Sequence, residues 1–111
     1  MADSEKSRGG ADVVFDTVNE QVVIGAAIAD ARVRRTLVHQ LSADEFLVPV
    51  HAPIWRTLKA ITDRGLEYER ETARAILARE GGDAEAATYL ERLEDESAVP
   101  NNLDWHVSTV T

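Results

Sequence analysis

Apolar residues recur every three or four positions along most of this chain, and this spacing restricts the fold more than any other feature. In the stretch 50–64, Val50, Ile54, Leu58 and Ile61 fall on one stripe of a helix. Similar stripes occur at about 16–29, 31–40, 71–79, 84–95 and from residue 102 onward. No alternating run of β-branched residues is long enough for a sheet. The pattern predicts an all-α fold, a compact orthogonal bundle of five to six helices.

Helix stop and start signals separate the periodic segments. Gly65 follows the stripe at 50–64 and predicts a left-handed residue that ends that helix. Gly81 and Gly82 predict the next stop, and Asp83 is a typical N-cap for the segment that follows. A Gly-Gly-Asp run of this kind also occurs in nucleotide cyclases, but there it belongs on a β-hairpin.

Ser42 and Glu45 have the spacing of a capping box, in which each side chain satisfies a backbone N–H of the other. Because Pro49 follows soon after, only a short turn is expected here. Ahead of the first helix, residues 1–14 are polar and predict a flexible tail, so the helical domain is expected to span residues 15–111.

The chain has 20 acidic and 12 basic residues and a formal net charge of −8. Because a phosphate-binding surface normally has a basic excess, direct nucleic-acid binding is not expected. The cluster Arg32, Arg34 and Arg35 predicts a solvated helix face. The cluster Glu91, Glu94, Asp95 and Glu96 predicts a solvated acidic face, part of which could contact a partner.

The absence of cysteine excludes disulfides, thiolate catalysis and cysteine zinc sites, and it fits a cytoplasmic protein. The N-terminus has no apolar core of a secretory signal, and no apolar run is long enough for a membrane span.

Residue patterns for catalysis are also missing from the sequence. No glycine precedes a Lys-Ser or Lys-Thr pair, as a phosphate-binding loop requires. His39, His51 and His106 lack the spacing of helical metal ligands. We therefore expect no catalytic residue, metal or cofactor in this chain.

Four segments in a fixed order resemble the N-terminal domain of DnaB-type replicative DNA helicases, over about residues 17–110. They are "NEQVVIGAAIAD" (19–30), "LSADEFLVPVHAPIWRTLKAITDRG" (41–65), "GGDAEAATYLERL" (81–93) and "VPNNLDWHVSTV" (99–110). The matching positions are Glu20, Ile24, Gly25, Leu41, Ser42, Glu45, Phe46, His51, Trp55, Gly81, Gly82, Tyr89, Leu90, Val99, Pro100 and Asn102. The connector "LEYERE" (66–71) departs from the family pattern, which leaves the start of the following helix open.

The resemblance implies a non-catalytic collar domain that assists ring assembly and contacts primase, loader proteins or neighbouring helicase subunits. ATP and Mg²⁺ would be bound by a separate C-terminal ATPase domain. The alternative is a complete small phage- or plasmid-type factor that binds a helicase or primase; an enzyme is the third alternative. Because the family's pairing hairpin lies beyond these segments, we expect a monomer or weak dimer.

His51 is the most conspicuous polar residue in these segments. It precedes Trp55 by four residues, so the two rings can stack on one helix face. A structural hydrogen bond at the start of that helix is the favoured role, ahead of partner contact and of catalysis.

Overall fold

The computed structural model describes the backbone of residues 10–110 and the side chains of residues 17–110. These residues form six α-helices and one 3₁₀ turn, with no strand between residues 10 and 110. The helices are α2 (Gly10–Ala29), α3 (Ala31–Gln40), α4 (His51–Asp63), α5 (Arg70–Arg79), α6 (Ala84–Asp95) and α7 (Leu103–Val110), and the turn is η1 (Ala43–Glu45). The all-α prediction is confirmed.

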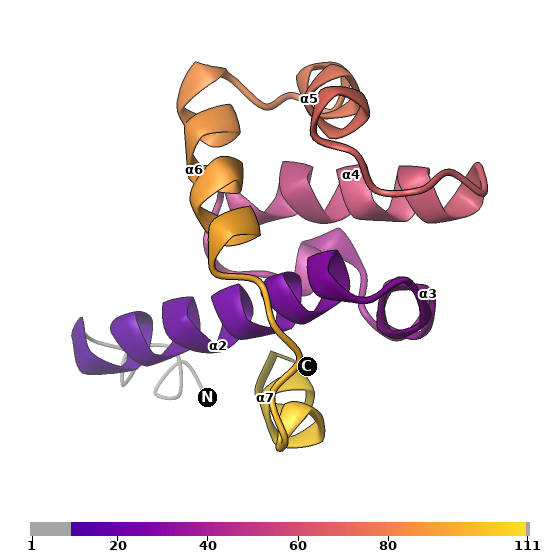
Figure 1. The fold of residues 1–111 in the computed structure, drawn as a ribbon. Helices are drawn as coiled ribbons and strands as arrows, with labels where there is room; N and C mark the ends of the chain where they lie inside the picture. Colours follow the sequence, from indigo (N-terminus) through magenta and orange to yellow (C-terminus); the bar gives the residue numbers. More distant parts are fainter. Residues whose placement is uncertain (1–9, 111) are drawn as a thin grey trace.

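The helices cross rather than align. In Figure 1, α2 and α4 lie across the view, α3 and α5 are seen nearly end-on, and α6 runs from the level of α5 past α4 toward α2. Helix α7 packs against α2 on the side away from α4 (Figure 1). This arrangement is the orthogonal bundle expected from the sequence. None of the helices in residues 10–110 is long and apolar enough to cross a lipid bilayer.

Most helix boundaries agree with the sequence signals. Helices α3 and α6 have the expected ends, and α4 and α5 differ from the expectation by about one residue. Helix α2 begins at Gly10, earlier than expected, and so extends into the segment assigned to the tail. Residues 1–9, the rest of that tail, lie outside the described residues.

The capping signals act where they were expected. Gly65 and Gly81 have φ of 66° and 94°, the left-handed conformation that ends a helix at low cost only for glycine. Asp83 accepts the backbone N–H of Ala86 at 2.9 Å. In η1 the Glu45 carboxylate accepts the Ser42 N–H at 2.8 Å, while the Glu45 N–H donates mainly to the Ser42 carbonyl at 3.1 Å.

A single apolar core joins all six helices. Its largest fully buried side chain is Trp55, and most of the remainder comes from leucine, isoleucine, valine and alanine. The indole N–H of Trp55 donates to the Leu41 carbonyl at 2.9 Å, so this residue also ties α4 to the end of α3.

Two charged residues expected at the surface, Arg34 and Glu94, have side chains that are almost fully withdrawn from water. Arg34 is 4 % exposed, because its guanidinium donates to the last carbonyls of α2, at Ala27 (2.9 Å) and Ile28 (3.4 Å). The prediction of a solvated face is wrong for Arg34, whereas Arg32 and Arg35 are exposed.

The acidic face needs a similar correction at one position. The Glu94 side chain is 5 % exposed and forms a bidentate pair with Arg74 at 2.8 and 2.9 Å. It also accepts the hydroxyl of Tyr68 and lies 3.2 Å from Arg70. Despite burial, these donors lower the pKa of Glu94, whereas Glu91, Asp95 and Glu96 are exposed as expected.

Trp55→Phe should destabilise the fold by about 2 kcal/mol, because it leaves the Leu41 carbonyl without its donor and opens a small cavity. Urea unfolding followed by circular dichroism measures the loss. Trp105→Phe, at a half-exposed site in α7, is the comparison and should cost less. Equal losses in the two variants would contradict the role assigned to Trp55.

Candidate functional site

The candidate site is built around a buried carboxylate, that of Glu20. It sits on α2, is 2 % exposed, and accepts three hydrogen bonds. The donors are the backbone N–H groups of Leu47 (2.7 Å) and Val48 (3.2 Å), and Nδ1 of His51 (2.7 Å). Such charge-assisted bonds offset the cost of removing a carboxylate from water.

His51 is the first residue of α4 and is fully buried. Its Nδ1–H donates to Glu20, and its Nε2 forms a hydrogen bond with the hydroxyl of Tyr89 on α6, 2.7 Å away. The Tyr89 oxygen in turn accepts from Nε2 of Gln21 on α2, also at 2.7 Å. We call Glu20, His51, Tyr89 and Gln21 the polar relay; it joins α2, α4 and α6.

The hydrogen bonds place the imidazole of His51 between the carboxylate of Glu20 and the phenol of Tyr89. Burial raises the pKa of Glu20, but the bonds from His51, Leu47 and Val48 outweigh it and hold the pKa below its ordinary value. Burial raises the pKa of Tyr89. The relay thus has the connectivity of an acid–base–nucleophile triad, and burial disfavours the phenolate form of its terminal tyrosine.

Aromatic rings surround His51 on two sides. Its ring stacks on Tyr89 with centroids 5.5 Å apart and meets the edge of Phe46 at 6.3 Å. The expected stacking on Trp55 is replaced by these contacts, and Trp55 instead lies against Phe46 at 4.8 Å. The four-residue spacing correctly placed His51 and Trp55 on one helix, but the ring that stacks on His51 is that of Tyr89, from α6.

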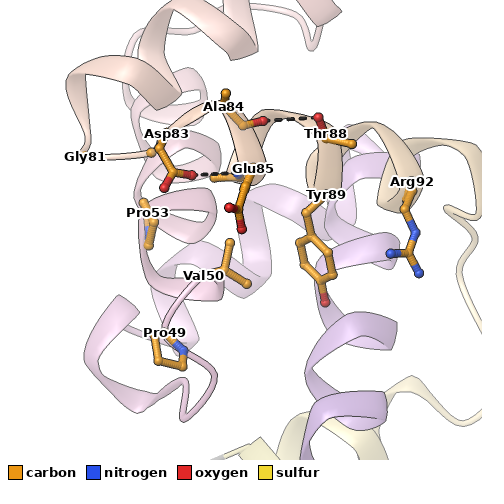
Figure 2. A pocket seen from close by; sticks show the side chains of 12 residues that line it. Pro49, Val50, Pro53, Gly81, Asp83, Ala84, Glu85, Thr88, Tyr89 and Arg92 are labelled. Carbon is orange, nitrogen blue, oxygen red and sulfur yellow. Dashed lines mark hydrogen bonds between the residues drawn. The ribbon is translucent and has the colours of Figure 1, made fainter.

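An open groove of about 730 Å³ lies beside the relay, between α6 and the segment 49–53. Figure 2 shows Glu85 projecting from α6 toward Val50, with Tyr89 farther along α6 and Arg92 at the far end. Gly81 and Gly82 line the end of the groove next to Asp83. Tyr89 belongs to both the groove wall and the relay.

The motif residues of the sequence separate into two groups. Phe46, His51, Trp55 and Tyr89 gather with Glu20 around the relay. Gly25 and Pro100 instead line a smaller pocket of about 230 Å³ near the end of α6, and a Cβ on Gly25 would lie 3.6 Å from Cα of Ser97. Asn102 lies at the start of α7, where its carbonyl accepts the Trp105 N–H.

Sequence reasoning missed Gln21, which has no signal beyond its place next to Glu20. It also missed the pair formed by Asn19 and His106, where His106 Nδ1 lies 2.7 Å from Asn19 Oδ1 and joins α7 to α2. The Nδ2 of Asn19 is buried without a hydrogen-bond partner in the described part of the chain. Among residues 17–110, no three histidine or carboxylate side chains are placed to share a metal ion.

His51→Ala should lower the free energy of unfolding by about 3 kcal/mol, because it leaves the buried Glu20 carboxylate and the Tyr89 hydroxyl without their shared partner. Thermal melting and urea titration measure this loss. His39→Ala, at an exposed position of α3, is the control and should change stability by less than about 0.5 kcal/mol. A melting temperature unchanged by His51→Ala would refute a structural role for the relay.

Glu20→Gln tests the charge of the relay separately. A carboxyl whose pKa is lower in the folded state stabilises the fold above its ordinary pKa of 4.5, and this contribution is lost as pH falls through the lower folded value. The variant should cost about 2 kcal/mol at neutral pH. Its stability should also fall less than that of the wild type as the pH drops below 4.5. Glu94→Gln, which removes a second carboxyl with a lowered pKa, gives the reference for the same measurement. Parallel pH profiles of wild type and Glu20→Gln would contradict this assignment.

Comparisons with curated proteins and with solved structures gave no match. A family model, described as the DnaB-like helicase N terminal domain, matches residues 14–111 and so covers nearly all of the chain. The match includes the relay, the groove and all the motif residues that the sequence singled out. The chain therefore belongs to the family of DnaB-like helicase N-terminal domains.

Proposed function

We propose that this chain is the non-catalytic N-terminal domain of a replicative DNA helicase and acts in DNA replication by supporting ring assembly and by contacting primase or loader proteins. The observation that carries the proposal is the family match over residues 14–111. The parent helicase supplies ATP-dependent strand separation through a different domain.

The internal chemistry supports a scaffold role. The polar relay is buried, and its side chains bond to one another and to the backbone of the loop before α4, so these bonds join three helices. We propose that nucleotide and Mg²⁺ are not ligands of this chain. No glycine in its sequence is followed by the Lys-Ser or Lys-Thr pair of a phosphate-binding loop.

The surface charge supports protein partners over nucleic acid. With a net charge of −8, the domain repels a phosphate backbone at long range. We further propose that the isolated chain is a monomer or weak dimer, since the same charge opposes close approach of two copies.

Binding to the primase and the helicase loader encoded in the same genome tests the proposal. Size-exclusion chromatography with light scattering should show the free chain as a monomer or weak dimer, and a larger complex with at least one purified partner. Calorimetry should give a dissociation constant on the order of micromolar, the range of transient assemblies. Failure to bind primase, loader and intact helicase subunits would contradict the proposed function, as would ATP hydrolysis by this chain.

A further inference from the structure

The groove between α6 and the segment 49–53 has an apolar floor. Pro49, Val50 and Pro53 form one side, and Ala86 and Tyr89 contribute from α6. Its volume of about 730 Å³ lies within the range of sites that hold a small ligand or a few side chains of a peptide. Next to it, Leu47 is exposed at the surface of the same loop.

Neither acidic side chain at the groove, Asp83 or Glu85, forms an ion pair with another residue of 17–110. Glu85 projects across the groove toward Val50 (Figure 2), and among residues 17–110 it takes part in no ion pair. Asp83 uses one carboxylate oxygen for the Ala86 N–H. By contrast, Arg70 and Arg74 on the α5 side of α6 are paired with Glu91, Glu94 and Asp95. The groove therefore presents negative charge at the N-terminal end of α6.

The wall opposite α6 is held in place from inside. Glu20 accepts the N–H groups of Leu47 and Val48, and the carbonyls of Val48 and Pro49 accept the N–H groups of His51 and Ala52. Tyr89, which forms part of the α6 wall, is bonded to His51. Both walls are thus fixed by the polar relay, and a ligand would not have to order them.

We propose that this groove binds a short segment of a partner protein that carries one or two aliphatic side chains flanked by lysine or arginine. The aliphatic groups would rest on Pro49, Val50 and Tyr89, and the basic groups would face Asp83 and Glu85. The proposal rests on the proposed function, for which it names the docking surface and the chemistry of the partner segment.

Charge complementarity selects this occupant. A second copy of the chain also has a net charge of −8, and a nucleic acid would bring phosphates to Asp83 and Glu85. Arg92 lies over the Tyr89 ring at 5.9 Å at the other end of the groove. The basic end of the segment should therefore lie at the N-terminal end of α6.

Three synthetic peptides of equal length and identical leucine positions test the groove, with lysine, glutamine or glutamate in the flanking positions. Amide chemical shifts of the ¹⁵N-labelled chain report both the site and the affinity. The lysine peptide should bind about tenfold more tightly than the glutamate peptide, with shifts concentrated at 47–53 and 83–92, and added salt should weaken it. Absence of binding by the lysine peptide, or shifts spread over other acidic faces, would overturn the proposal.

Matched variants distinguish binding at the groove from attraction of the basic peptide to the acidic surface in general. Glu85→Lys should weaken the lysine peptide about tenfold, whereas Glu71→Lys, also exposed and in the first turn of its helix, should leave the affinity within about twofold. Thr88→Arg, at an exposed α6 position lining the groove, should weaken binding by steric occlusion. Equal effects of Glu85→Lys and Glu71→Lys would refute the site.

The same variants distinguish this proposal from the proposed function. If primase or loader binds wild type, Glu85→Lys and Thr88→Arg equally well, the domain function holds and the groove is not its docking site. If the lysine peptide binds as expected while primase and loader do not bind at all, the groove holds and the proposed function fails. Melting curves of Glu85→Lys and Thr88→Arg close to wild type establish that neither variant acts by unfolding.

Discussion

One buried carboxylate sets the geometry of this domain. The buried carboxylate of Glu20 is stabilised in its ionised form by hydrogen bonds from Leu47, Val48 and His51 at 2.7, 3.2 and 2.7 Å. Those donors come from the loop before α4 and from its first residue, so burying the charge positions the loop, orients His51 and aims its second nitrogen at Tyr89. A domain of this size has few ways to specify how three crossing helices meet. Hydrophobic burial has no direction, whereas these bonds do.

The features of the fold that could be predicted from the sequence are those set by residues close to one another along the chain. Helix periods, glycine stops and the Asp83 cap each act within a few residues, and they occur where they were expected. Burial of Arg34 and Glu94 could not be anticipated in the same way. Charged side chains usually stay in water, and the carbonyls or guanidinium that satisfy these two come from other helices.

In the candidate site, too, the individual residues could be predicted from the sequence, but the contacts between them could not. The sequence singled out Glu20, His51 and Tyr89 one by one, through a family resemblance, but spacing along the chain does not report that they touch across 31 and 38 residues. Spacing also suggested the wrong ring partner for His51. It shows which residues share a helix face, but it does not show which other element packs against that face. The groove was not foreseen, since it exists only where α6 crosses the loop before α4.

Two phenols add to the core contacts and ion pairs that attach helix α6 to the rest of the molecule. Tyr89 links it to α2 and α4, and five residues later Glu94 receives the hydroxyl of Tyr68, whose ring lies 5.9 Å beneath the Arg34 guanidinium at the end of α2. A helix held at one point can swing about it, but a helix held at two points can neither rotate about its axis nor slide. The two attachments therefore fix the position of α6 relative to the loop before α4, and with it the separation of the two walls of the groove.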